Sequence, residues 1–171
     1  MTHIQSFDYV AAPDARVLVL GSIPGLKSLQ EVQYYAHPRN GFWPIMARLL
    51  DFDPALPYPQ RLEALKGSGI ALWDVVHRCH RPGSLDQNIA GDSVEANDFA
   101  SFFRLHPGVR TIFFNGGTAE TLFKRHVIRG GIALPAGLEM TRLPSTSPAN
   151  AGIRLEQKLE QWRAVLDSLR P

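Results

Sequence analysis

The stretch RVLVLGSIPG, from Arg16 to Gly25, decides how the rest of the chain is interpreted. Its first half is an apolar run that favours a buried strand, and its second half is a turn built from glycine, proline and a small polar residue. The strand is predicted over Arg16–Leu20, and three similar apolar segments follow it: Ile70–Val76, Thr111–Phe114 and Leu138–Leu143. Their near-continuous apolar character predicts buried strands of a parallel sheet that is covered on both faces.

Helical patterns lie between and after these strands. Two segments repeat apolar residues at the spacing of one helix face: Phe42, Ile45, Met46, Leu49 and Leu50, and then Leu155, Leu159, Trp162, Leu166 and Leu169. Asp92 and Glu95 resemble a capping box ahead of another helix, which would contain Phe99, Phe102 and Phe103. Strands that alternate with helices predict a three-layer α/β fold, and the chain has no repeat or linker, so we expect residues 1–171 to form one domain.

The composition excludes several classes of protein. Of the 171 residues, 44% are hydrophobic and 20% are charged, which is typical of a soluble globular protein. No apolar run approaches the roughly 18 residues of a membrane helix, and the first residues lack the basic start of a secretory signal, so we expect no membrane association and a cytoplasmic location. The single cysteine, Cys79, excludes an intramolecular disulfide, a four-cysteine zinc site and an iron–sulfur cluster.

Ligands of such folds bind at the carboxyl ends of the strands, and four unusual segments follow the predicted strands. These are GSIPG (Gly21–Gly25), Asp74 leading into HRCHRPGS, NGG (Asn115–Gly117) and PSTSPAN (Pro144–Asn150). GSIPG either brings backbone N–H groups to a phosphate or a base edge, or simply forms a tight turn. Asp74 either binds a base N–H or pairs with Arg78 or Arg81.

The stretch QYYAHPRNGFW combines two aromatic residues with a cation and a carboxamide. Tyr34 and Tyr35 suit the face of a base, while the amide of Asn40 suits a base edge or a water molecule. Asn40 also stands directly before a helical pattern and is a candidate N-cap. His37 either contributes to the site or fills a turn.

The basic stretch after the second strand has two interpretations. His77, Arg78, His80 and Arg81 either form a phosphate-contact surface or are solvated charges on a loop. The histidine pair has no carboxylate, cysteine or third histidine at a ligand spacing, so the sequence predicts no metal site. The formal net charge of +2 favours an anionic partner only weakly.

The last two segments also have structural explanations. PSTSPAN holds hydroxyl and backbone N–H groups that suit phosphates, although an ordinary helix-entry loop explains it equally well. For Asn115 we expect a cap of the helix TAETLFKRH rather than a ligand contact.

Taken in order, these segments resemble the uracil-DNA glycosylase superfamily. GSIPG matches its first motif, G-x-x-P-G, and PSTSPAN stands where its second motif lies. The set GSIPGLKSLQ, QYYAHPRNGFWPIM, LWDVV, RPGSLDQNI and PSTSPAN resembles the hypoxanthine-DNA glycosylase family more closely still, from about Arg16 to Trp162. Two positions depart from the superfamily: Ile23 replaces a water-positioning Asn or Asp of the first motif, and Ser145 stands where the second motif often has a His.

The resemblance implies an α/β/α fold with a central four-stranded parallel sheet, and hydrolysis of the N-glycosidic bond of a damaged base in DNA. Hypoxanthine is implied as the preferred base and uracil as a possible one. Asn40 would orient the water, Tyr35 would stack on the flipped base and Asp74 would read a base N–H. The implied substrate-binding residues are Gly21, Ser22, Ile23, Pro24, Gly25, Tyr35, His37, Phe42, Asp74 and Asn115. The implied DNA-binding residues are Arg39, Arg78, Arg81, Ser145, Thr146, Ser147, Pro148, Ala149 and Asn150.

The resemblance also implies a monomer whose partner is damaged DNA and which needs no cofactor. Lys27 is the only lysine in the matched segments, so a Schiff-base lyase step is not expected. Three alternatives remain: a uracil or mismatch-specific glycosylase, a catalytically silent module that binds damaged DNA, and another α/β enzyme that binds free nucleotides through GSIPG.

Overall fold

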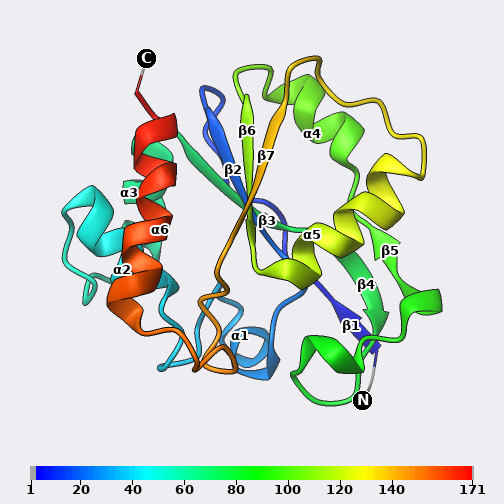
Figure 1. Ribbon diagram of the computed structural model, residues 1–171, viewed down its shortest axis with the longest axis horizontal. Helices are drawn as coiled ribbons and strands as arrows, with labels where there is room; N and C mark the ends of the chain where they lie inside the picture. The colour runs from blue at the N-terminus through cyan, green and yellow to red at the C-terminus, as the bar shows by residue number, and fades with distance from the viewer. Residues whose placement is uncertain (1–2, 171) are drawn as a thin grey trace.

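The computed structural model describes residues 3–170, and its centre is a four-stranded parallel sheet (Figure 1). The strands lie in the order β3-β2-β6-β7, which are Ile70–Asp74, Val17–Gly21, Thr111–Asn115 and Glu139–Leu143. All four predicted strands are therefore confirmed. The second ends at Asp74, two residues earlier than predicted, and the fourth begins at Glu139.

Alternate side chains of the inner strands enter two separate cores. Leu18 and Leu20 of β2 pack with one cluster, whereas Val17 and Val19 pack with the other. Successive side chains of a strand point to opposite faces of the sheet. Because both faces are covered here, every position of a buried strand is apolar and the run is continuous. The edge strand β7 differs, since only its Leu143 is buried, so the prediction of a fully covered fourth strand is wrong.

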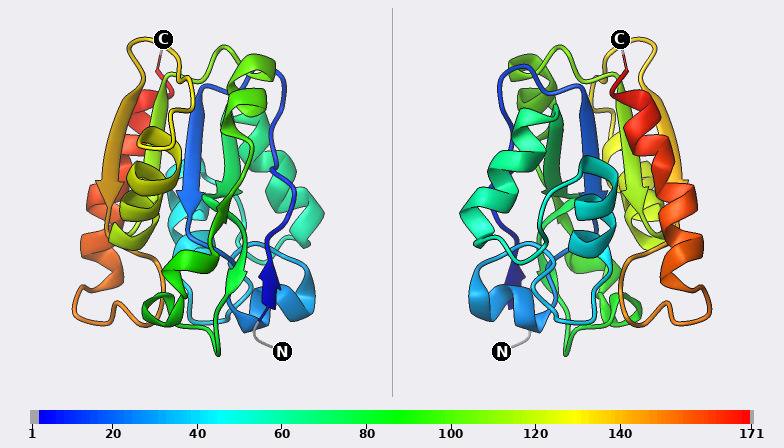
Figure 2. Two further views of the ribbon diagram at one scale, coloured as in Figure 1. Left: turned by 90° about the vertical axis from the view of Figure 1, so that its right-hand side faces the viewer. Right: turned by 90° about the vertical axis from the view of Figure 1, so that its left-hand side faces the viewer.

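Helices cover both faces of the sheet and complete the three layers, as predicted. One face carries α2, α3 and α6, which are Phe42–Leu50, Tyr58–Gly67 and Leu155–Ser168 (Figure 2, right). The other carries α4 and α5, which are Phe99–Leu105 and Gly117–Phe123, the latter continued by a π-helical turn over Lys124–Ile128. The short helix α1, Leu26–Glu31, lies at the carboxyl end of the sheet (Figure 1).

The predicted capping box is wrong. Asp92 lies in a short 3-10 turn, Gly91–Ser93, and Glu95 lies in a short strand. The actual N-cap of α4 is Asp98, whose carboxylate accepts the backbone N–H of Ser101 at 3.1 Å. Asp98 is another acidic residue of the same stretch, and it stands directly before Phe99, where the apolar pattern begins.

A second, antiparallel sheet was not predicted. Its strands are β1, β4 and β5, which are His3–Gln5, Val76–His80 and Glu95–Ala96, with β4 in the centre. The chain leaves β3 after Asp74 and enters β4 almost at once. The basic stretch HRCHR is therefore mostly a strand, and not a loop at the carboxyl edge of the main sheet.

Candidate active site

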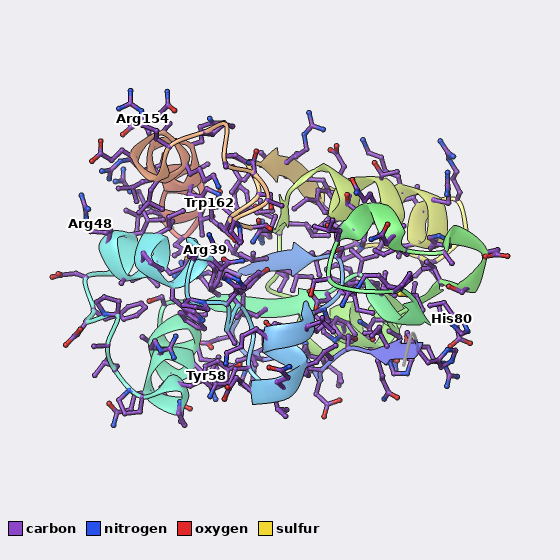
Figure 3. All side chains as sticks on the ribbon, turned by 90° about the horizontal axis from the view of Figure 1, so that it is seen from below. Arg39, Arg48, Tyr58, His80, Arg154 and Trp162 are labelled. Atoms are coloured by element: carbon purple, nitrogen blue, oxygen red, sulfur yellow. The ribbon has the colours of Figure 1, made fainter. Side chains whose placement is uncertain are left out.

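A groove of about 1100 Å³ lies at the carboxyl ends of the four parallel strands. Its lining includes all of Gly21–Gly25, the segment around Tyr35 and Asn40, Asp74 and the loop 144–150. The strand-end rule therefore predicted this gathering correctly. Figure 3 looks onto this end of the molecule, with Arg39 labelled at the groove and His80 of β4 well to one side.

Gly21 closes the floor of the groove, and its lack of a side chain is a packing requirement. It is the register partner of Asp74 across β2 and β3. A Cβ atom added to Gly21 would stand 2.6 Å from the Asp74 carboxylate oxygen Oδ1 and 3.1 Å from the Tyr35 hydroxyl. Two polar side chains thus occupy the space that any larger residue would need, which gives the first glycine of GSIPG a direct physical reason.

Asp74 is buried in the wall of the groove, with only 4% of its surface exposed. Its Oδ2 atom has no hydrogen-bond partner among residues 3–170. Burial, followed by the negative charge of Asp86, raises the pKa of Asp74 to about 7, while the charge of Arg81 opposes the rise. At neutral pH the carboxyl group is therefore poised between its two protonation states, which is typical of a functional carboxyl.

The alternative that Asp74 pairs with Arg78 or Arg81 is wrong. Arg78 instead forms a salt bridge with Glu95 of the neighbouring strand. Arg81 is fully buried, and its Nε donates to the carbonyl of Gly83 at 2.9 Å. Asp74 forms no salt bridge within the described part of the chain, so it remains free to meet a ligand.

Tyr35 is held against Phe42 rather than standing free. The two rings stack with centroids 4.1 Å apart and an interplanar angle of 24°. Phe42 is fully buried and supports Tyr35 from behind, so its predicted contact with substrate is wrong. Tyr35 also has a left-handed backbone, with φ of 57°, a conformation that costs free energy in a non-glycine residue and needs such support.

Asn40 lines the groove and also supports the start of α2. Its Oδ1 accepts the backbone N–H of Phe42 at 2.9 Å. The N-cap of α2 is nevertheless Gly41, which no side chain caps, so the prediction that Asn40 is the N-cap is wrong. The bond to Phe42 fixes the orientation of the amide, because an N–H can bond only to the oxygen. The side-chain NH2 makes no hydrogen bond to any described residue and is available to a water or a substrate.

His37 forms the turn before Asn40. Its Nδ1 accepts the backbone N–H of Arg39 at 3.1 Å, and its carbonyl accepts that of Asn40 at 2.9 Å. The turn interpretation is thus confirmed, while His37 and Arg39 both line the groove as well. The turn aims the following amide toward the groove.

Asn115 locks the loop 144–150 in place. Its Nδ2 donates to Thr146 Oγ1 and its Oδ1 accepts the Thr146 backbone N–H, both at 2.9 Å. The expected cap of α5 is wrong, because the N-cap is Gly116 and no side chain caps it. Asn115 itself also lines the groove, as the sequence predicted for a substrate-binding residue.

The loop 144–150, which precedes α6, is held by hydrogen bonds and forms a wall of the groove. Trp162 of α6 donates to the carbonyl of Pro144 at 2.9 Å, and Asn150 donates to that of Ser145 at 3.1 Å. Gly41, next to Asn40, donates to the carbonyl of Thr146 at 2.9 Å. This last bond connects the loop 144–150 to the segment that carries Asn40. The predicted set lines the groove throughout: Ser145, Thr146, Ser147, Pro148, Ala149 and Asn150.

The comparisons with known proteins agree with this architecture. The family model of the uracil DNA glycosylase superfamily matches residues 7–170. The chain belongs to this superfamily. It is 35% identical to a hypoxanthine DNA glycosylase of Methanosarcina acetivorans, over 94% of this chain and 96% of that protein. A hypoxanthine DNA glycosylase of Methanosarcina barkeri is 37% identical over 66% of this chain and 70% of its own. A solution NMR structure from Methanosarcina acetivorans, described as a candidate uracil DNA glycosylase, has a TM-score of 0.80 at 32% identity and covers 98% of both chains.

The basic residues after β3 do not line the groove. Arg78 and Arg81 do not line it, and the buried Arg81 cannot meet a phosphate without a rearrangement. Besides Arg39, Lys27 of α1 and Arg142 of β7 line it. Arg142 makes only a long ion pair with Glu120, at 3.9 Å, and is mostly exposed.

Sequence reasoning missed several groove residues. The segment Ser84–Gln87 lines the mouth, although RPGSLDQNI was used only as a mark of resemblance. The hydroxyl of Ser22 donates to Asp86 at 2.7 Å and so ties this segment to the first motif. The available signal was its serine, aspartate and asparagine content, typical of an ordered turn, but nothing in it indicates which edge of the sheet it reaches.

A metal-binding cluster and a membrane-spanning helix are both absent from the described part of the chain. From residue 3 to residue 170, no group of three or more His, Cys, Asp or Glu side chains could hold a metal ion. Over the same residues, no helix combines the length and the apolar character needed to cross a membrane.

Proposed function

We propose that this protein is a monofunctional DNA glycosylase, which hydrolyses the N-glycosidic bond of a deaminated base in base excision repair and prefers hypoxanthine. The observation that carries the proposal is the pairing of a buried, unpartnered carboxyl, Asp74, with an available amide, Asn40, in one groove. The names of the two Methanosarcina relatives support the choice of base. We further propose that it acts as a monomer in the cytoplasm.

The first step is extrusion of the damaged nucleotide into the groove, at a cost of a few kcal/mol that is lower for a base with faulty pairing. Tyr35, fixed from behind by Phe42, offers its other face to the extruded base. The wall 144–150 and the cations Arg39, Lys27 and Arg142 would hold the flanking phosphates.

Asp74 would select the base by its hydrogen-bonding edge. Hypoxanthine carries a proton on N1, which an ionised carboxylate accepts. Adenine has an unprotonated N1, which would face the carboxylate as a second acceptor and leave it unpaired. An unpaired buried acceptor costs about 1–3 kcal/mol, so the ionised form of Asp74 disfavours undamaged adenine.

The bond between C1′ and the base nitrogen then breaks, and its electron pair leaves with the base. Positive charge develops on the sugar, as in glycoside hydrolysis generally. The amide of Asn40 would hold the water, donating through its NH2 while Oδ1 keeps its bond to Phe42. The oxygen of this water bonds to C1′ and the water loses a proton, while the departing base anion takes up one proton. Ile23 of the first motif has no polar group for this task, so the water depends on Asn40.

The direct test is a panel of duplexes with hypoxanthine, uracil, xanthine or a mismatched thymine, each incubated with the protein and then treated with alkali. We expect strand breaks at hypoxanthine above all. Tight binding of the inosine duplex without alkali-labile sites would mean a silent binding module, and binding of free nucleotides in place of duplex DNA would mean a different α/β enzyme.

Removal of metal should leave the reaction unchanged. Excision is expected to persist in EDTA, and strand cleavage should still require alkali, because water and not a lysine attacks the sugar. Borohydride trapping of a covalent adduct between protein and DNA would contradict this mechanism.

A further inference from the structure

One lysine is buried in the helix that follows the loop 144–150. Lys158, in the first turn of α6, is only 6% exposed. Its ammonium group forms no ion pair or hydrogen bond with any residue from 3 to 170. Burial lowers the pKa of this group below its ordinary value. A buried charge without a partner costs free energy, so the fold alone does not account for Lys158.

Two features of α6 increase this cost. The positive end of a helix dipole lies at the N-terminus, so a cation close to Leu155, where α6 begins at the carboxyl end of the sheet, is unfavourably placed (Figure 1). Arg154 stands four residues before Lys158, and like charges at this spacing repel each other. Both features would instead favour an anion at this end of the helix.

The geometry of the helix places Lys158 beside the groove. Residues three and four apart are neighbours on one side of a helix. At these distances after Lys158 stand Gln161, which lines the groove, and Trp162, which donates to the carbonyl of Pro144 at 2.9 Å. Lys158 therefore lies between a residue of the groove and the residue that holds the loop 144–150.

The neighbouring acidic residues of α6 do not neutralise this lysine. Glu156 and Glu160 stand two residues before and after Lys158, and residues two apart do not face each other on a helix. Glu156 lines a second cavity, away from the groove, and Glu160 pairs with Arg163 at 3.2 Å. A counterion for Lys158 must therefore come from outside the described residues.

We propose that Lys158 is the counterion of a DNA phosphate that lies at the edge of the loop 144–150 when a duplex occupies the groove. The proposal rests on the proposed function only in that DNA is the ligand. One phosphate brings negative charge to the ammonium group and to the N-terminus of α6 together, so that both unfavourable placements become favourable. Lys158 is thus a positioning residue, which fixes the strand beside the groove and does not touch the reacting atoms.

The test uses Lys158→Met, which preserves the length of the side chain and removes its charge. We expect the affinity for a duplex with a stable abasic-site analogue to fall roughly tenfold, the loss typical of one charged contact. The slope of log affinity against log salt should fall by about one. Stability in urea should stay equal or rise, because an unpaired buried charge is removed.

Lys66→Met is the matched control. Lys66 of α3 pairs with Glu63 at 2.8 Å and does not line the groove, so affinity and salt slope should stay unchanged. If Lys158→Met failed to fold, Lys158→Gln would take its place, with the same expected loss of affinity. Normal affinity and slope in the folded variant would overturn the proposal, and so would a loss of stability as the only effect.

Inorganic phosphate separates DNA from a free anion. At equal phosphate concentration the duplex should raise the melting temperature of the unaltered protein far more, and Lys158→Met should lose part of this rise. An equal rise with inorganic phosphate would contradict the assignment to DNA. None of these measurements needs catalysis. If the unaltered protein bound the duplex but excised no base, the proposed function would fail, while the role of Lys158 would still be decided.

Discussion

Two polar regions follow β3 in the sequence, and the structure separates them. Asp74, the last residue of β3, lies in the groove, whereas His77–His80 of the basic stretch, only three residues later, belong to β4 and to the antiparallel sheet. The sequence shows both regions as polar residues after an apolar strand. The rule that ligands bind at the carboxyl ends of parallel strands therefore applies to the residues at the turn after a strand. It does not apply to residues that already belong to the next strand.

If this comparison is correct, changes in the groove should impair catalysis and changes in β4 should not. The largest effect is expected for Asn40→Ser. The serine hydroxyl still offers an oxygen to the Phe42 N–H, so the fold should survive, but the loss of an amide that holds the attacking water should reduce the single-turnover rate roughly 100-fold or more. Arg78→Ala, in β4, is the control and should excise at close to the normal rate. A fully active Asn40→Ser enzyme with a normal melting temperature would remove Asn40 from the mechanism.

The next effect concerns the pH dependence of stability, through Asp74. In the unfolded chain this carboxyl ionises near its ordinary pKa of 3.8, whereas in the folded protein its pKa is about 7. The folded state therefore holds the proton between these values, and its stability falls as the pH rises from about 4 to 7. Above pH 7 the loss is complete, on the order of 4 kcal/mol.

Asp74→Asn removes this titration, so the variant should exceed the unaltered protein in stability at pH 8 but not at pH 4 to 5. Urea unfolding at both pH values measures the difference, and Asp14→Asn, at an exposed carboxyl, should leave it unaltered. The same variant should lose the rise in excision rate through pH 7 that an accepting carboxylate implies. If Asp74→Asn lowered the stability equally at both pH values, burial would not raise the pKa of Asp74.

The smallest effect separates the cations of the two regions. Arg39→Ala should weaken binding to every duplex alike and reduce the slope of log affinity against log salt by about one, as expected for the loss of one phosphate contact. Arg78→Ala should leave the slope unchanged, because Arg78 is paired with Glu95 away from the groove. A reduced slope for Arg78→Ala would extend the DNA surface onto β4.

The physical origin of each pattern explains what the sequence could predict. Unbroken apolar runs predict the burial of β2, β3 and β6, and the apolar spacing from Phe42 predicts α2. The sequence of a strand does not specify which other strand it pairs with. Hence the pairing of β4 with β1, the burial of Arg81 and the bond between Asn115 and Thr146 could not be predicted, since each depends on residues that are distant in sequence.

The choice of hypoxanthine over uracil is the central claim, and it rests on Asp74, Tyr35 and the serine at position 145. A neutral hydroxyl stabilises a departing uracil anion less well than an imidazole does, whereas hypoxanthine spreads its charge over two rings. A purine also gains more from stacking on Tyr35, a contact worth about 1–3 kcal/mol per base. The decisive measurement is single-turnover excision from matched duplexes that carry inosine or deoxyuridine at one position. We expect hypoxanthine to leave faster; if uracil left faster in every sequence context, the assignment of substrate would be wrong.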